Sequence, residues 1–235
     1  MHGFQSILNI FELPLLALQH KRMNRYLTLA LSFIFSSTLL FAQPDGKSKN
    51  ILKKSEEHYK SFKTITADFT LTTAGEGRKA HTNKGKLYIK GNKFRLEYAE
   101  QTIYCDGKNI WSYNPMDEEV TLETYKKKTN DLSPQDMFNL YNRNFKSIFE
   151  GTVKSGSEVH NVVKLVPKKR KEKFAYIKVQ IDHKTSELRK VIQHFKNGTE
   201  VVVAVTQFTP NNTLSDTHFA WQASEHKGAV LVDLR

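Results

Sequence analysis

The sequence predicts a mainly β (α+β) domain, an incomplete and strongly curved antiparallel β-barrel whose concave face is covered by two amphipathic helical segments. Three observations lead to this prediction. About ten segments of strand length and composition follow one another along the chain. Most are joined by hairpin-length connections, which place neighbouring strands antiparallel. Only two stretches have the spacing of amphipathic helices, and an open sheet of this size curls or closes.

The N-terminal residues are predicted to be a targeting segment. Residues 23–42 run from a short basic start through an uncharged apolar stretch to Ala42. This order is typical of a secretory signal peptide, and the apolar stretch is short for a membrane span. We expect residues 1–22 to be a mis-called start or an extended n-region. Residues 43–235 are expected to form a single domain with a sizeable core.

The domain is predicted to begin with a helix followed by a strand. Residues 47–62 carry one stripe at helical spacing, with lysines and glutamates opposite. That stripe consists of Ile51, Leu52, Ser55, Tyr59 and Phe62. Residues 64–73 are rich in β-branched side chains, which favours a strand, and residues 75–77 form its turn.

A meander of strands is predicted from residue 84 to residue 125. Tight turns are indicated at Asp106-Gly107 and at Asn114-Pro115. The alternation puts one set of side chains on an apolar face and the other on a polar face: Phe94, Leu96 and Tyr98 against Lys93, Arg95 and Glu97. Such an apolar face must pack against a cover.

The second helix is predicted at residues 133–141, where Ser133-Pro134 is typical of a helix start. Residues 145–149 are expected to continue this helical segment and to add apolar side chains to it. Strands then return at residues 159–166, 174–181, 188–195 and 199–208, with a last strand at 229–233. Periodicity alone leaves open whether the two helices plug the sheet as an ordinary core or act as a lid over a ligand.

Composition and motifs narrow the function classes. The net charge of +12 favours acidic partners, such as anionic lipid headgroups or acidic proteins, and the predicted export argues against nucleic acid as a partner. The basic residues 168–171 are predicted to form a solvated hairpin tip, with docking on an acidic membrane partner or on anionic headgroups as the alternative. Cys105 is the only cysteine, so no intramolecular disulfide forms, and we expect it to be a small buried side chain.

The sequence lacks the usual signs of catalysis. It has no His-x-x-x-His pair, no Gly-x-Ser-x-Gly elbow, no phosphate-binding glycine loop and no dinucleotide fingerprint. The acidic residues 117–119 are expected to form a solvated turn. We therefore predict no metal site, no cofactor and no enzymatic activity.

Four segments resemble the LolA-type outer-membrane lipoprotein carrier family: residues 85–90, 94–98, 106–115 and 208–219. The resemblance covers nearly all of residues 47–235, and Asp-Gly-Lys-x-x-Trp-x-Tyr-Asn-Pro is its most specific run. It implies an unclosed antiparallel barrel with an α-helical lid. It also implies a periplasmic shuttle that takes acylated lipoproteins from an inner-membrane ABC-type lipoprotein release complex. An outer-membrane acceptor or the membrane surface receives the cargo.

The resemblance also implies a binding site. It places Phe94 at the cavity mouth and Leu96 among the lining residues. The residues expected to line the apolar cavity and its lid are Phe69, Leu87, Ile89, Phe94, Leu96, Tyr98, Trp111, Met137, Phe138 and Leu140. The chain departs from the family at Gly91-Asn92, where the family often has an arginine that ties the lid to the barrel.

The predicted function is therefore that of a monomeric, non-enzymatic periplasmic carrier of acylated lipoproteins. Two alternatives stay open at this point. One is a periplasmic lipid or lipoprotein sensor built on the same barrel. The other is a hydrolase acting on envelope lipid or glycan, which would need convergent polar groups in the cavity.

Overall fold

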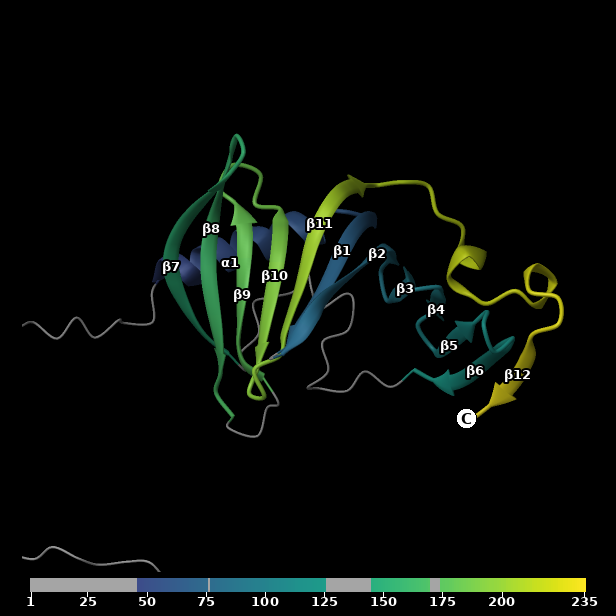
Figure 1. Ribbon diagram of the computed structural model, residues 1–235. Coiled ribbons are helices and arrows are strands. Elements are labelled where there is room, and N and C mark those ends of the chain that lie inside the picture. The colour runs from purple at the N-terminus through teal and green to yellow at the C-terminus, as the bar shows by residue number, and fades with distance from the viewer. Residues whose placement is uncertain (1–45, 76, 126–144, 170–173) are drawn as a thin grey trace, which may run out of the picture. The chain divides into compact units, whose positions relative to one another are not determined.

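The computed structural model describes residues 46–75, 77–125, 145–169 and 174–235, all within one compact unit that spans Ala42–Arg235. These residues form a 12-stranded sheet, one α-helix and two short 3-10 helices (Figure 1). The prediction of a mainly β fold is thus confirmed. Within the described residues, no helix is long and apolar enough to cross a membrane.

The first elements are α1 (Gly46–Lys60), β1 (Thr64–Gly75), β2 (Arg78–Lys90), β3 (Lys93–Tyr98), β4 (Gln101–Cys105), β5 (Asn109–Asn114) and β6 (Glu119–Thr124). They are followed by β7 (Phe145–Ser155), β8 (Glu158–Pro167), β9 (Phe174–Asp182), β10 (Leu188–Phe195), β11 (Glu200–Pro210), η2 (Asp216–Phe219), η3 (Ala223–Glu225) and β12 (Val230–Asp233).

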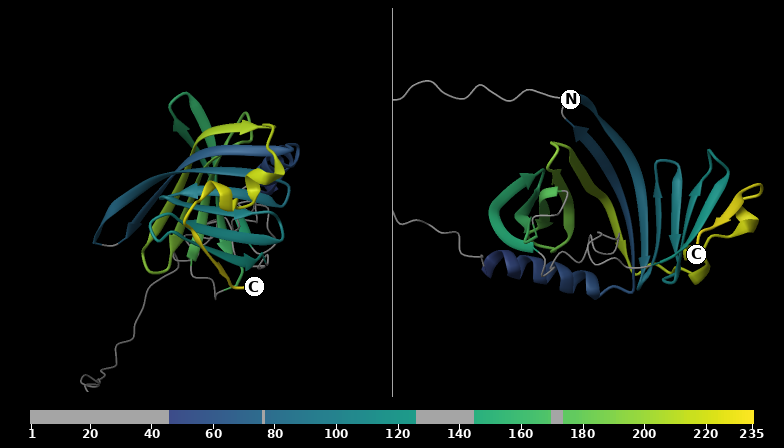
Figure 2. Two further views of the ribbon diagram at one scale, coloured as in Figure 1. Left: turned by 90° about the vertical axis from the view of Figure 1, so that its right-hand side faces the viewer. Right: turned by 90° about the horizontal axis from the view of Figure 1, so that it is seen from below.

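The sheet is open and strongly curved (Figure 2). Its strand order is β12-β6-β5-β4-β3-β2-β1-β11-β10-β9-β8-β7, so β12 and β7 lie at its two edges. Neighbouring strands are antiparallel, as the hairpin-length connections predicted, except that β12 runs parallel to β6. The segment between Pro210 and Val230 joins β11 to β12, which pairs with β6 at the edge of the sheet; because β6 and β12 are not consecutive, no hairpin constrains their relative direction.

Helix α1 covers part of the inner face of the sheet, running across strands β8, β9 and β10 in Figure 1. Its buried residues are Ser48, Leu52, Ser55 and Tyr59. The last three belong to the predicted stripe, whereas Ile51 is partly exposed and Phe62 lies beyond the end of the helix. At one end, the Ser48 hydroxyl donates to the Ser147 hydroxyl on β7 at 2.9 Å. At the other end, the backbone N–H of Leu188 donates to the Tyr59 hydroxyl at 2.8 Å. These two bonds tie the helix to both sides of the β7–β10 half.

One predicted helical segment is a strand. Residues 145–149, expected to continue a helix, begin β7. Ser147 is buried against α1 while Lys146 is exposed, which is the two-residue alternation of a half-buried strand. The predicted helix at residues 133–141 lies outside the described residues.

The core lies between α1 and the inner face of the sheet. Its buried side chains come from the helix and from strands in both halves of the sheet. They include Leu52, Tyr59, Ile65, Ala67, Leu87, Ile89, Val163, Leu165, Ile177, Val179, Ile181 and Leu188. One continuous apolar cluster therefore extends across the sheet.

The segment after β11 packs against the outer face near β3. Phe219 in η2 is fully buried there. Asp216 lies 3.0 Å from the Lys90 ammonium and 2.8 Å from that of Lys93, and Lys90 also donates to the Leu214 carbonyl at 2.7 Å. This segment thus has a fixed place on the sheet.

Candidate functional site

The candidate site is the apolar inner face of strands β1 to β5. Side chains that are directly paired across antiparallel strands point to the same face. Leu87, Leu96 and Ile103 are paired in this way across β2, β3 and β4. In the neighbouring row, Phe94 is paired with Cys105. The meander therefore presents adjoining apolar rows rather than isolated apolar residues.

Phe69 and Tyr98 form an aromatic pair on this face. Their rings are stacked with a centroid distance of 6.4 Å and an interplanar angle of 17°. Gly85 lies between them in the register, paired with Phe69 on one side and Tyr98 on the other. A Cβ atom at Gly85 would clash with Phe69 Cζ and lie 2.7 Å from Phe69 Cε2. Only glycine leaves room for the Phe69 ring at this point of the strand.

The predicted lining residues fall into two groups by exposure. Phe69, Leu87, Ile89 and Phe94 are buried and belong to the core cluster. Phe94 was expected at a cavity mouth, yet its side chain is only 3% exposed and its ring lies 6.1 Å from that of Tyr125. These buried residues form the floor of the inner face.

The other group remains partly exposed and could contact a ligand. Leu96 and Tyr98 were predicted, whereas Ile103 and Ile110 were missed. Both isoleucines flank the predicted Asp106-Gly107 turn, so the alternation in β4 and β5 could have identified them. The four side chains share the inner face of β3, β4 and β5 next to the buried cluster.

The remaining predicted residues do not join this group. Trp111 is paired with Tyr104 and with Leu122. Tyr104 is in turn paired with Arg95, on the face opposite to Phe94. Trp111 therefore lies on the outer face of the sheet. The predicted lid residues Met137, Phe138 and Leu140 lie outside the described residues.

The Gly91-Asn92 turn, where the family arginine is missing, joins β2 to β3. Gly91 has a φ of +57°, a conformation that glycine adopts without strain. The turn is flanked by Lys90 and Lys93, the two lysines that hold Asp216. Lys93 and then Lys90 lower the pKa of the Asp216 carboxyl below its usual value. The described contacts of this hairpin thus hold the segment after β11 against the sheet.

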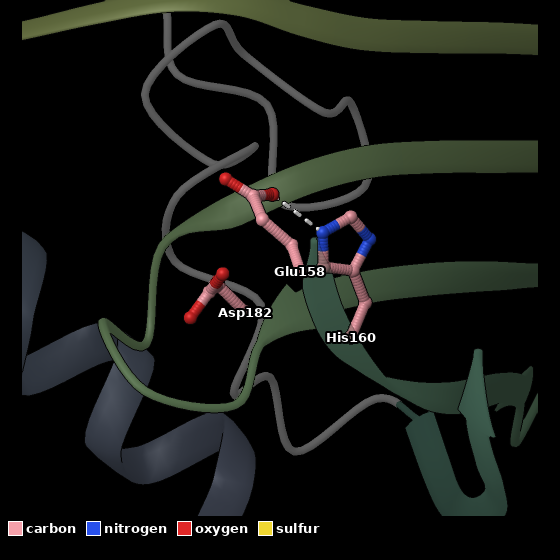
Figure 3. Close-up of side chains that lie close together, drawn as sticks. All are labelled: Glu158, His160 and Asp182. Carbon is pink, nitrogen blue, oxygen red and sulfur yellow. Dashed lines mark hydrogen bonds and ion pairs between the residues drawn. The ribbon is translucent and has the colours of Figure 1, made fainter. Parts of the chain in front are cut away.

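A second cluster of polar side chains was not predicted. Glu158 and His160 on β8 and Asp182 at the end of β9 place one ligand-type atom each within 4.8 Å of the others (Figure 3). His160 is 4% exposed and Asp182 is 5% exposed. The His160 Nε2 atom lies 2.8 Å from Glu158 Oε2. Three such groups could in principle hold a metal ion, and the surrounding contacts test that possibility.

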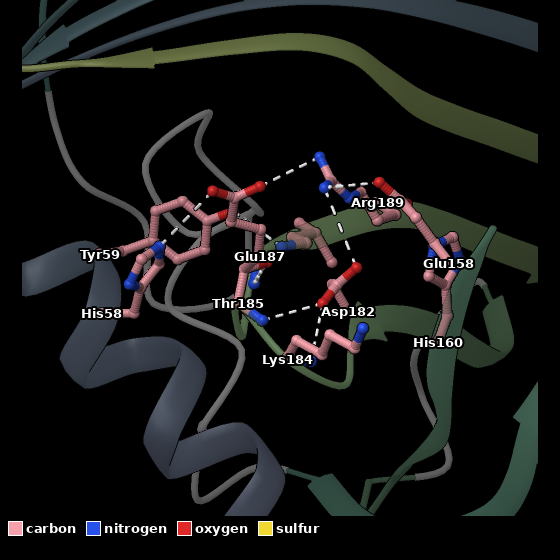
Figure 4. Close-up of polar contacts among 10 residues, drawn as sticks. His58, Tyr59, Glu158, His160, Asp182, Lys184, Thr185, Glu187 and Arg189 are labelled. Carbon is pink, nitrogen blue, oxygen red and sulfur yellow. Dashed lines mark hydrogen bonds and ion pairs between the residues drawn. The ribbon is translucent and has the colours of Figure 1, made fainter.

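Arg189 supplies the positive charge for this cluster (Figure 4). Its guanidinium lies 2.9 Å from Glu158 Oε1, 3.0 Å from Glu187 Oε2 and 3.9 Å from Asp182 Oδ2. Burial would raise the pKa of the Asp182 carboxyl, but N–H bonds from Thr185 and Lys184, together with Arg189, lower it. The carboxylates already have partners within the protein, so the geometry favours a structural ion-pair network over a metal centre.

The network reaches helix α1 through Glu187. Glu187 Oε1 lies 4.0 Å from His58 Nε2 on the helix, and the next residue, Leu188, donates to Tyr59. Helix α1 is therefore fixed to the turn between β9 and β10 by contacts that also involve β8. No short-range sequence pattern joins these residues, because they come from three distant segments.

Cys105 offers no nucleophile at neutral pH. The side chain is fully buried, and burial raises the pKa of the thiol to about 11. A thiol with that pKa is protonated at neutral pH, whereas the thiolate is the reactive form. The prediction of a small buried side chain is confirmed.

A polar depression of about 470 Å³ lies beside β1, β2 and β3. Its charged groups are largely paired with one another: Lys86 lies 3.3 Å from Asp68, and Arg95 lies 2.8 Å from Glu97. Because these charges are paired within the protein, the apolar inner face remains the better candidate for a ligand site than this depression.

Comparison with known proteins finds similarity to a family of lipoprotein carriers. A family model described as outer membrane lipoprotein carrier protein LolA matches residues 60–222. The outer-membrane lipoprotein carrier protein of Haemophilus influenzae is 30% identical over 177 residues, which cover 73% of this chain and 81% of that protein. An uncharacterized protein of Methanocaldococcus jannaschii is 28% identical over 126 residues, but the match spans only 36% of its length and 54% of this chain.

A solved structure supports the fold. The uncharacterized conserved protein from Thermus thermophilus superposes with a TM-score of 0.55 at 13% identity, covering 80% of this chain and 99% of that one. At this identity the similarity concerns the fold alone.

Proposed function

Because the chain belongs to the family of outer membrane lipoprotein carrier proteins LolA, we propose that it carries acylated lipoproteins through the periplasm. The acyl chains lie against the partly exposed apolar side chains of β3, β4 and β5. The protein takes its cargo from an inner-membrane ABC-type lipoprotein release complex and gives it to an outer-membrane acceptor or membrane surface. It acts as a monomer, without cofactor and without catalysis.

The observation that carries this proposal is the incompletely buried apolar face. Leu96, Tyr98, Ile103 and Ile110 adjoin the buried cluster yet keep part of their surface exposed. Apolar side chains grouped in this way are expected to be covered by an apolar ligand or partner. An acyl chain needs only such a surface, whereas a hydrolase would need a nucleophile with a base.

The energetics of acyl binding explain why a carrier needs membrane partners. Burial of an acyl chain contributes roughly 0.8 kcal/mol per methylene, or on the order of 10 kcal/mol for one long chain. That free energy corresponds to a dissociation constant of about 10⁻⁷ to 10⁻⁸ M. A lipoprotein with several chains would not dissociate into water on a useful timescale. Transfer must therefore proceed from one apolar surface to another.

The proposal is tested by Leu96→Gln. This change places a polar amide on the inner face at a partly exposed position, so the fold should survive. We expect the affinity for a fluorescent long-chain acyl probe, and the extraction of a purified triacylated lipoprotein from vesicles, to fall by roughly ten-fold.

Ile192→Gln is the matched control. Ile192 is also partly exposed, but it is paired with Lys178 and Val202 on the opposite face. Equal losses in the two variants, or no loss in Leu96→Gln, would argue against the inner face as the acyl site. Phe94→Glu is less useful, because a charge at a position that is 3% exposed would unfold the domain.

A further inference from the structure

One end of the β7–β11 half carries a concentration of lysines. The register brings the start of β7 beside the end of β8, with Phe145 opposite Pro167. It likewise brings the end of β10 beside the start of β9, with Phe195 opposite Phe174. The lysines at or just beyond these strand ends are Lys146, Lys168, Lys169 and Lys196. We call this group the basic end.

The four lysines of the basic end lie at the same end of these strands, and each side chain is exposed to solvent. Lys146 lies on β7, Lys168 and Lys169 directly follow β8, and Lys196 directly follows β10. These strands belong to a run of four neighbours, β7 to β10, whose spacing is about 4.8 Å. Among the described residues, Glu150 and Glu200 on this half form ion pairs with cations other than Lys146, Lys168 and Lys169. The charge of these three lysines is thus available to an external partner.

The outer face next to the basic end also carries lysines, here grouped around a tyrosine. Tyr176 on β9 has the Lys164 ammonium 4.3 Å and the Lys178 ammonium 5.7 Å from its ring centroid. All three side chains are partly exposed. Lysine and tyrosine side chains have an apolar body and a polar tip. Such side chains suit the boundary between water and lipid, where the apolar part contacts lipid and the polar tip contacts water.

The opposite end of the same strands has a different charge pattern. There the carboxylates of Glu158, Asp182 and Glu187 converge on the Arg189 guanidinium. Positive and negative groups offset each other at that end, whereas the described side chains of the basic end are mostly cationic. The β7–β11 half is therefore electrostatically polarised along its strands.

We propose that the basic end docks the protein on a membrane surface rich in anionic lipid headgroups. This inference rests on the proposed carrier function, because a carrier must approach membranes to exchange cargo. Exposed lysines are compact, mobile charges that suit a diffuse layer of headgroups. Lipid is therefore the occupant that the geometry favours.

The test measures binding of the full mature chain to vesicles of phosphatidylglycerol mixed with phosphatidylcholine, and to vesicles of phosphatidylcholine alone. The variant neutralises the basic end with K146Q, K168Q, K169Q and K196Q. Each lysine near an anionic surface strengthens binding by roughly five-fold, so the expected loss is on the order of 100-fold or more. Wild-type binding should also weaken as salt rises, because salt screens these charges.

The matched control removes four other exposed lysines with K54Q, K108Q, K154Q and K184Q. Lys54 lies on α1 and Lys108 in the β4–β5 turn, whereas Lys154 and Lys184 lie at or just beyond the far ends of β7 and β9. The control has the same net charge as the basic-end variant and should keep binding within about three-fold of wild type. Equal losses in both variants would overturn the proposal, because net charge alone would then explain binding. Absence of wild-type binding to anionic vesicles at low salt would also overturn it and would point to an acidic protein instead.

Failure of this inference can be distinguished from failure of the carrier function. The basic-end variant should still bind the acyl probe, because its substitutions lie away from Leu96. Leu96→Gln should still dock on anionic vesicles. Loss of acyl binding in the basic-end variant would contradict the separation of the two surfaces.

Discussion

Replacing Gly85 with alanine should destabilise the protein, although alanine ordinarily stabilises a fold relative to glycine by restricting the unfolded chain. The new Cβ would clash with Phe69 Cζ and would lie 2.7 Å from Phe69 Cε2 and 2.9 Å from the Glu97 carbonyl oxygen. Rotation of the Phe69 ring could relieve the first two contacts, at the expense of its stacking on Tyr98. The third contact is with backbone, which can only move together with β3.

The expected magnitude follows from opposing effects. Restriction of the unfolded chain favours alanine by about 0.4–1 kcal/mol. Overpacking of a filled core typically costs about 1–3 kcal/mol, and the lost aromatic pair adds about 0.5–1.5 kcal/mol. The net expectation is a loss of about 1–3 kcal/mol in the free energy of unfolding. Urea denaturation followed by circular dichroism measures this loss.

A double-mutant cycle with Phe69→Val identifies the cause. Valine lacks the ring atoms that the new Cβ meets, so Gly85→Ala should cost at least about 1 kcal/mol less in the Phe69→Val background. Additive effects of the two substitutions, or a Gly85→Ala protein as stable as wild type, would refute the reasoning about close approach.

Three further predictions concern named side chains. Tyr59→Phe removes the acceptor of the buried Leu188 N–H and should lower the free energy of unfolding by about 1–3 kcal/mol. Tyr176→Phe on the outer face is the control and should lower it by less than about 0.5 kcal/mol. Similar losses in the two variants would show that the α1 contact is unimportant. The lowered pKa of Asp182 means that its ionised form stabilises the fold above the ordinary carboxyl pKa of about 4 and that this stability is lost as pH falls through the lower folded-state pKa. Asp182→Asn should therefore weaken the acid dependence of urea denaturation, and an unchanged pH profile would contradict this assignment. Cys105 should react with iodoacetamide at a pH of about 8 far more slowly in the native protein than in urea, because it is buried and its pKa is raised to about 11; comparable rates would mean that this strand opens readily.

Local patterns in the sequence predicted most of the fold. The Asp106-Gly107 and Asn114-Pro115 turns correctly mark hairpins between β4 and β5 and between β5 and β6. The amphipathic stripe of residues 47–62 correctly indicated helix α1 and its buried side. These features depend on short-range chemistry, namely glycine conformations at turns and apolar spacing on a helix.

Other features depend on contacts between distant segments and were missed. The last strand was predicted, but nothing in its four residues specifies parallel pairing with β6. The structure places Trp111 on the outer face and Ile110 on the inner face. A one-residue change of register would exchange the two, and the β4–β5 pairing decides which of them faces inward. The Arg189 network joins three segments, so no single stretch of sequence reveals it.

The central claim is that this chain holds acylated cargo on its inner face. Native mass spectrometry of the protein purified from its own compartment tests that claim most directly. We predict a population whose added mass corresponds to a bound acylated lipoprotein, and this population should decrease in Leu96→Gln but not in Ile192→Gln. Protein recovered without any apolar ligand, under conditions that preserve non-covalent complexes, would contradict the claim.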